Sequence, residues 1–212
     1  MAFARLDHVI ARVPDIRASH ARLIEEHGFA EAWPIGAFWP AALTSGVALG
    51  GLNLELVQSL EGAVGPNADT LVFEPKTLEA ASDALTGAGV AVRRFEKVEP
   101  NPELLRLRGF EGSRPERICT NLMPESPAPL DFFVCEYAPF LRERLAPHRF
   151  PMQHGEARSV EVVVPDPEAA EAFLAKVGYA GVPLRFAGGE SHRVRTIAFA
   201  DGRVLALDRT TL

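Results

Sequence analysis

The sequence predicts an α+β protein of repeated β-α-β-β-β modules, whose curved mixed or antiparallel sheets form a cupped barrel with the helices outside. Two stretches of the 212 residues carry this prediction, LDHVIARVPD at 6–15 and SVEVVVPD at 159–166. Each is an alternating strand that ends in Val-Pro-Asp and leads into an alanine-rich helix. A fainter copy, DTLVFEPKTLEAASDALTGAGVAV, begins at residue 69. Because one module alone leaves an apolar sheet face uncovered, modules must pair, and the concave face between them suits a ligand.

The first module is expected over residues 1–62 and opens with a strand from Phe3 to Val13. Strict alternation places two sets of side chains on opposite faces, one with Asp7, Val9, Ala11 and Val13 and the other with Leu6, His8, Ile10 and Arg12. Asp15 is placed to cap the following helix, and Gly28 is placed to end it. A turn-rich loop, WPIGAFWPAALTSG, then precedes a hairpin formed by VALG and GLNLELVQ.

The second and third modules are expected over residues 66–140 and 155–212, with residues 141–154 as a connecting loop. In the second module, LRLRGF, RICTNLM and LDFFVCEY are predicted to complete the sheet. In the third, Asp201-Gly202 predicts a tight hairpin. The sequence leaves open whether the first module closes the cup with the second or with the third. A sheet left over would be covered elsewhere, for example in a homodimer.

Composition narrows the classes of partner. A net charge of -6 argues against binding to nucleic acid or to an anionic membrane surface. No apolar run approaches the roughly 20 residues that a membrane-spanning helix needs. Two cysteines do not make a disulfide framework, so a cytoplasmic location is expected. Basic residues such as those in LRLRGF are interspersed with acidic and apolar ones and are interpreted as solvated faces. A small-molecule ligand is therefore the expected partner.

The strand LNLELV places an acid on the concave face of the predicted cup. Leu52, Leu54 and Leu56 share the face that must pack on the helix, so Glu55 points to the opposite side. A carboxylate there is costly to bury unless a cation or hydrogen bonds receive it. If His8 also points into the cup, the imidazole and the carboxylate form half of a site for a divalent metal.

The runs LDHVIARVPD…HGF and LNLELV, with the later run FFVCEYAPF…MQHGEARSVEVVVPDPEAA, resemble the vicinal oxygen chelate superfamily of glyoxalases and extradiol dioxygenases. The glyoxalase-like branch is the most similar. The resemblance implies paired β-α-β-β-β modules around a metal-binding funnel. It also implies a divalent ion (zinc, manganese, iron or nickel) as cofactor. His8 and Glu55 stand at the positions of the family's first-strand histidine and fourth-strand glutamate, which are metal ligands.

The other modules do not repeat these two residues. Alignment on the helices sets Thr70 and Ser159 against the histidine, and Ala206 against the glutamate. None of the three is a good metal ligand. Glu136 is then the best third ligand on chemical grounds. His154, on a loop that would cap the cup, is a further candidate metal ligand.

Two functions are expected from these residues. The first is a metal-dependent enzyme, of lyase, isomerase or dioxygenase type, that acts on a small oxygenated molecule chelated in the cup, with Glu55 as a catalytic base. Arg12 would pair with a substrate carboxylate, and an apolar pocket would be walled by Trp33, Phe38 and Trp39. The alternative is a metal-free protein of the same fold that binds or sequesters a small molecule, which the losses in the other modules favour.

Overall fold

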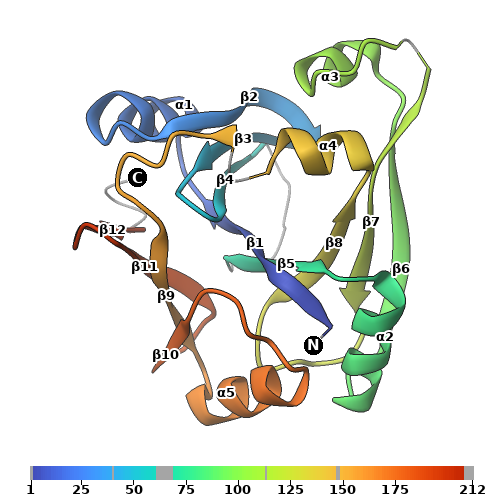
Figure 1. Ribbon diagram of the computed structural model, residues 1–212, viewed down its shortest axis with the longest axis vertical. Helices are drawn as coiled ribbons and strands as arrows, with labels where there is room; N and C mark the ends of the chain where they lie inside the picture. The colour runs from blue at the N-terminus through green and yellow to red at the C-terminus, as the bar shows by residue number, and fades with distance from the viewer. Residues whose placement is uncertain (1, 40, 61–68, 113, 147–148, 208–212) are drawn as a thin grey trace.

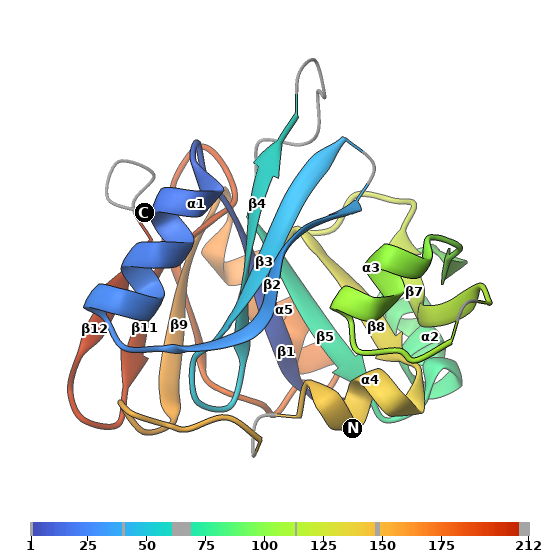
Figure 2. The ribbon, with the colours of Figure 1, turned by 90° about the horizontal axis from the view of Figure 1, so that it is seen from above.

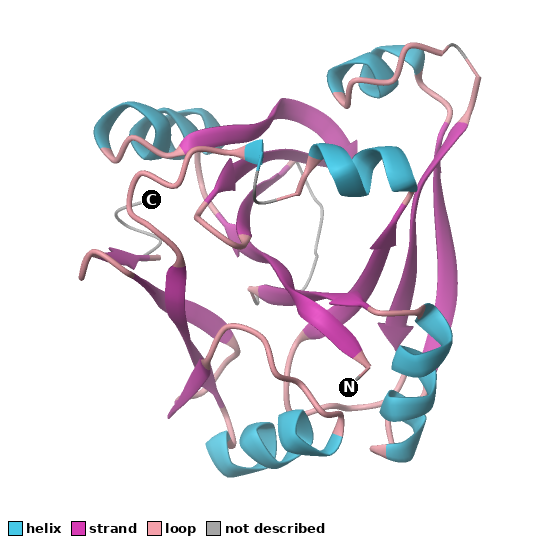
Figure 3. Cartoon of the chain, in the orientation of Figure 1, coloured by secondary structure: helices cyan, strands magenta, loops and turns pink. Residues whose placement is uncertain are grey.

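The computed structural model describes residues 2–39, 41–60, 69–112, 114–146 and 149–207, which form two sheets and five α-helices (Figure 1 and Figure 3). The strands are β1 (Phe3–Arg12), β2 (Ala30–Trp39), β3 (Ala42–Ala48), β4 (Asn53–Ser59), β5 (Thr70–Pro75), β6 (Val92–Glu99), β7 (Glu116–Pro124), β8 (Phe132–Tyr137), β9 (Ala157–Val164), β10 (Leu184–Gly188), β11 (Arg193–Phe199) and β12 (Val204–Ala206). The helices are α1 (Ile16–Ala21), which continues as a π-helical segment (Arg22–Glu26), α2 (Leu78–Gly87), α3 (Pro102–Leu107), α4 (Pro139–Arg144) and α5 (Pro167–Lys176).

The first eight strands form one curved sheet in the order β2-β3-β4-β1-β5-β8-β7-β6 (Figure 2). Its two halves have the same design, because β4 runs parallel to β1 in one and β8 runs parallel to β5 in the other. The halves join through the antiparallel pair β1 and β5. Strands of the first and second predicted modules therefore share the cup. The predicted boundary between these modules, residues 62–66, lies outside the described residues, and the division into modules stays a prediction.

The remaining strands form a smaller sheet in the order β10-β9-β11-β12. This order differs from that of the first half, because β10, which follows helix α5, pairs directly and in parallel with β9. The strand that follows the first helix, β2, instead lies at the far edge of its sheet. Asp69, next to β5, accepts a 3.0 Å hydrogen bond from the backbone N–H of Val194 in β11.

Apolar side chains of the small sheet pack into the same core as the convex face of the large sheet. Val160, Val162 and Ile197 share this core with Val9 and Leu54. The leftover sheet is therefore covered within the chain, and no second copy is needed for that purpose. A homodimer stays a prediction. None of the helices in the described parts of the chain is long and apolar enough to span a membrane.

The large sheet separates two apolar cores. The convex core contains the predicted leucine face of β4 together with side chains of α1, α2 and α5. The concave core contains Ile10, Val72 and Ile118 and is covered by Leu105 of α3 and Leu141 of α4. This second core surrounds the candidate site.

The local signals of the first module are confirmed. The Asp15 carboxylate accepts hydrogen bonds from two backbone N–H groups at the start of α1. Gly28 has a φ of +73°, which a glycine adopts without strain where a helix ends. The hairpin between β3 and β4 closes through a 2.9 Å hydrogen bond from Leu49 N to Leu52 O.

Two sequence predictions of local structure are wrong. Residues 33–46 are not a loop, because β2 and β3 pair across most of this range and register shifts accommodate Pro34 and Gly36. LRLRGF does not form a strand, because its first residues belong to α3. The Asn101 side chain caps that helix and Pro102 occupies its first turn, and both are helix-start signals.

Candidate functional site

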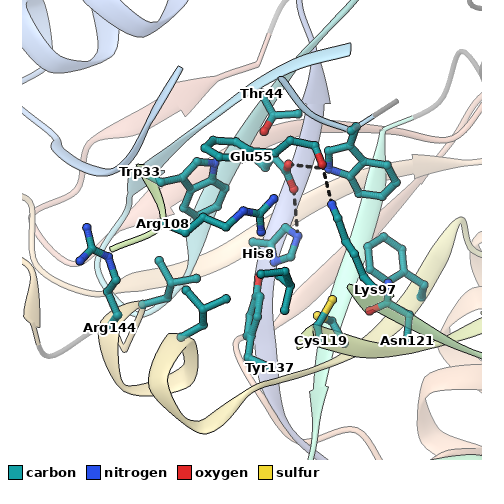
Figure 4. Close-up of a pocket in the computed structure, with 17 residues that line it drawn as sticks. His8, Trp33, Thr44, Glu55, Lys97, Arg108, Cys119, Asn121, Tyr137 and Arg144 are labelled. Atoms are coloured by element: carbon teal, nitrogen blue, oxygen red, sulfur yellow. Dashed lines mark hydrogen bonds and ion pairs between the residues drawn. The ribbon is translucent and has the colours of Figure 1, made fainter. Parts of the chain in front are cut away.

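The concave face encloses a cavity of about 70 Å³ against the C-terminal ends of α3 and α4 (Figure 4). Both halves of the large sheet contribute polar side chains to it, with His8 and Glu55 from the first and Lys97 and Tyr137 from the second. Most of the remaining wall is apolar and aromatic. A mostly apolar hollow with a few convergent polar groups is the usual form of a ligand site.

A bulge in β1 places Asp7 beside His8. The register slips between Leu6 and His8, so Leu6 packs in the convex core while His8 lines the cavity. The Asp7 carboxylate lies 2.7 Å from His8 Nδ1 and holds the imidazole in place. Strict alternation predicted that Asp7 lies on the face opposite His8 and that Leu6 lies on the same face as His8. Both placements are wrong because the bulge adds one residue to the strand.

Glu55 meets His8 on the cavity floor, as the leucine face of its strand predicted. Its Oε2 atom lies 3.3 Å from His8 Nε2, and its Oε1 atom accepts a 3.1 Å hydrogen bond from Trp39 Nε1. Both side chains are buried, with residue exposures of 3% for His8 and 6% for Glu55. The parallel pairing of β4 with β1 sets Glu55 opposite Ile10, two residues along β1 from His8. The side chains of Glu55 and His8 therefore meet in the cavity.

The pair carries opposite charges at neutral pH. Burial lowers the pKa of His8, but its hydrogen bonds with Asp7 and then with Glu55 outweigh burial and raise the pKa to about 9. Burial raises the pKa of Glu55, but the hydrogen bond and charge of His8 outweigh it, so this pKa lies below its ordinary value. The floor of the cavity is thus an imidazolium beside a carboxylate.

A chain of ion pairs links Asp7, the partner of His8, to helix α4. Arg5 forms ion pairs with Asp7 and, at 2.6 Å, with Glu74. Glu74 also pairs with Arg142 of α4, and this contact ties the helix beside the cavity to β5. These contacts fix the position of His8 and of the helix beside it.

Two cations lie in the cavity wall: Lys97, which the sequence did not single out, and Arg108, which was assigned to a solvated face. Lys97 Nζ of β6 donates a 2.7 Å hydrogen bond to the backbone oxygen of Phe38 and lies 4.7 Å from the centre of the Trp39 ring. Arg108, at the end of α3, lies 4.3 Å from the centre of the Phe38 ring. The interpretation of LRLRGF as a solvated face is therefore wrong for Arg108. Acidic, basic and apolar residues alternate around Lys97 and Arg108 in the sequence, and this pattern does not indicate that either residue lines a cavity.

The predicted aromatic wall is present, although on a strand. Trp33, Phe38 and Trp39 all line the cavity from β2. Trp33 packs directly against Gly46 of β3, where a Cβ atom would lie 2.2 Å from the indole. Gly46 therefore allows the ring its close approach to β3.

Three other predicted site residues do not line the cavity. Arg12 donates a 3.1 Å hydrogen bond to Ser59 Oγ at the end of its strand. Glu136 lies between Cys135 and Tyr137, and those two neighbours reach the cavity instead. His154 lies between the end of the first helical segment and the small sheet. Its Nε2 atom is 2.7 Å from the backbone oxygen of His27, and its Nδ1 atom is 3.2 Å from Asp201 Oδ2. The structure therefore does not bring these three together with His8.

The cavity offers two donors for the metal that the family resemblance implies. His8 Nε2 and Glu55 Oε2 are close enough to share an ion, and Asp7 orients the imidazole as a carboxylate does in many metal sites. Across β1 and β5, however, the residue that pairs with His8 is Val72. Within the described residues, no group of three His, Cys, Asp or Glu side chains is placed to hold a metal. Since protein sites for transition metals usually offer three or four ligands, this set does not fit a resident ion.

Comparison with known proteins identifies the fold. No protein-family model and no curated protein matches the sequence. A hypothetical protein from Staphylococcus aureus has a similar structure, with 11% identity, a TM-score of 0.59 and coverage of 94% of this chain and 97% of that one. A mutant 4-hydroxymandelate synthase from Streptomyces coelicolor has 12% identity and a TM-score of 0.51, covering 95% of this chain and 61% of that one. Homoprotocatechuate 2,3-dioxygenase from Arthrobacter globiformis has 16% identity and a TM-score of 0.54, covering 93% and 63%.

These similarities define the class of fold. The chain has the cupped α+β fold of vicinal oxygen chelate proteins, so the resemblance seen in the sequence is confirmed at the level of the fold. The chain spans about three fifths of the length of the synthase and of the dioxygenase. Identities this low show the fold alone, and the chemistry has to be argued from the cavity.

Proposed function

We propose that the cup binds a small organic molecule without a resident metal, and that His8 and Glu55 contact its polar group. The observation that carries the proposal is the buried imidazolium–carboxylate pair facing a hollow with aromatic walls. A buried ion pair is costly to maintain for stability alone, since its desolvation offsets much of its attraction. Pairs of titratable groups with perturbed pKa values, in a cavity, are candidates for functional sites.

The geometry leaves both side chains able to contact a ligand. Their 3.3 Å separation exceeds the roughly 2.7–2.9 Å of a charge-assisted hydrogen bond. The His8 Nε2–H group can therefore share its hydrogen bond between Glu55 and a ligand oxygen, and Glu55 can also accept from a ligand hydroxyl. If the ligand reacts, the same two groups serve as acid and base, with Asp7 holding the imidazole in position.

Tryptophan fluorescence tests this proposal. The chain has two tryptophans, Trp33 and Trp39, and both line the cavity. Titration with a panel of small hydroxy and oxo compounds is expected to find ligands that change the emission. His8→Gln and Glu55→Gln should weaken binding of such a ligand about tenfold or more, because each removes a hydrogen bond to a charged group.

The matched control is His20→Gln. His20 pairs with Glu31 and does not line the cavity, so this variant should bind as the wild type does. A ligand that quenches the tryptophans but binds equally to wild type, His8→Gln and Glu55→Gln would contradict the proposed role of the pair.

A metal-dependent enzyme acting on a small oxygenated molecule is the second candidate. The close approach of His8 to Glu55 and the orienting contact from Asp7 favour it. Metal analysis of purified protein separates the two candidates. Stoichiometric metal that is lost in both His8→Ala and Glu55→Ala would support the second candidate and overturn the metal-free proposal. Substoichiometric metal that neither substitution changes would rule the second candidate out.

A further inference from the structure

We propose that the ligand of this cavity is a small organic anion whose charged group binds at Lys97 and Arg108. This inference rests on the proposed function, because it names the chemical class of the molecule that enters the cup. It concerns residues of the second half of the sheet and of α3, on the wall beside the His8–Glu55 pair (Figure 4).

The cavity holds an excess of positive charge. His8 is balanced by Asp7 behind it, and the other charged residues of the lining are the basic Lys97, Arg108 and Arg144 and the acidic Glu55. Glu55 is already held by His8 and by the indole of Trp39. Among the described residues, neither Lys97 nor Arg108 forms an ion pair. Burying a cation costs free energy unless an anion pairs with it. A ligand that carries a negative charge would supply the missing partner.

The two cations also lie close enough to repel each other. Burial lowers the pKa of Lys97, and the charge of Arg108 lowers it further. Lys97 contacts a backbone oxygen and the Trp39 ring, and Arg108 contacts the Phe38 ring. These contacts leave most N–H groups of the two cations free. An anion between them would relieve the repulsion and accept those hydrogen bonds.

Unpartnered polar atoms in the lining support a polar ligand. Three buried atoms have no hydrogen-bond partner among the described residues: Arg108 Nε, Thr44 Oγ1 and Asn121 Oδ1. Thr44 is fully buried and Asn121 is 5% exposed, and both line the cavity. Buried polar groups are nearly always paired, so these atoms point to a bound polar molecule. An oxyanion would accept from Arg108, and a hydroxyl group of the same ligand would donate to Asn121.

The rest of the lining requires an apolar body in addition to the charge. Trp33 and Phe133 face the cavity, and its volume of about 70 Å³ limits the size of the ligand. In such surroundings a charge-assisted hydrogen bond is stronger than in water. A small aromatic or aliphatic acid combines the required charge, size and apolar surface.

Quenching of the two tryptophans by iodide and by neutral acrylamide tests the inference without a known ligand. Iodide should quench the wild type about twofold or more efficiently than Lys97→Gln or Arg108→Gln, because a cationic hollow concentrates anions. Acrylamide should quench all three proteins equally. Arg106→Gln, an exposed arginine of the same helix, should behave as the wild type. Equal iodide quenching in wild type and both cavity variants would overturn the inference.

A pair of probes of the same shape then tests the organic class. Benzoate should bind about tenfold or more tightly than benzamide, and Arg108→Gln should remove that preference. Equal binding of benzoate and benzamide would overturn the anion inference and leave the proposed function standing. Failure of acrylamide to quench the wild type, with binding of neither probe, would instead show a closed cavity and count against the proposed function itself.

Discussion

Protonated His8 should stabilise the folded state at neutral pH by an amount that the geometry sets. Its pKa is about 9 in the folded chain, against an ordinary value of 6.5, a difference of about 2.5. Each pKa unit corresponds to about 1.36 kcal/mol, so the imidazolium contributes about 3 kcal/mol to the free energy of unfolding. Because the folded pKa is the higher one, this contribution is complete below pH 6.5 and is lost as the pH rises through about 9.

Urea denaturation of wild type and His8→Gln, at about pH 6 and about pH 10, measures this contribution. The difference in unfolding free energy between the two proteins should shrink by about 3 kcal/mol over that range. Groups that do not contact His8 titrate alike in both proteins, so the difference reports on the histidine together with the two carboxylates that it contacts.

A difference between wild type and His8→Gln that stays constant with pH would contradict a raised pKa for His8. It would mean that the imidazole is neutral in the folded chain, or equally charged in the unfolded one. NMR titration of the imidazole resonances provides an independent reading in the wild type. A midpoint near pH 6.5 would refute the assignment of an imidazolium held by two carboxylates.

Two further predictions concern the supports of the cavity. Glu74→Gln should lower the free energy of unfolding, measured by urea denaturation, by about 2 kcal/mol, because it breaks two ion pairs at a buried carboxylate. Glu79→Gln, which removes an exposed ion pair, should change it by about 0.5 kcal/mol or less. Equal losses would contradict the role given to Glu74. Gly46→Ala should cost about 1–3 kcal/mol and change the emission of Trp33, since the new methyl group meets the indole. Gly87→Ala, with open space around it, should be neutral or stabilising by up to about 1 kcal/mol, and a Gly46→Ala protein with unchanged stability and emission would contradict the packing argument.

Local patterns in the sequence determined much of the fold. The capping aspartate, the glycine that ends the first helical segment and the β3–β4 hairpin depend on a few neighbouring residues, and each is confirmed. The leucine face of LNLELV also predicted correctly that Glu55 points into the cup, because an alternating strand with one fully apolar face has one possible orientation. The two mistaken elements, residues 33–46 and LRLRGF, are places where sheet pairing or a capped short helix outweighed the turn residues and the alternation.

Tertiary structure decided what surrounds that glutamate. Alternation cannot show a bulge, so the contact between Asp7 and His8 required the actual pairing of β1 with β5. Lys97 reaches the cavity from β6 and Arg108 reaches it from the end of α3, and no local pattern distinguishes them from solvated basic residues. Val72, paired with His8, likewise leaves the metal set at two donors. The sequence determined which side chains of β4 face inward, because that strand alternates without a bulge, while the charge balance of the cavity depends on contacts between residues far apart in the chain.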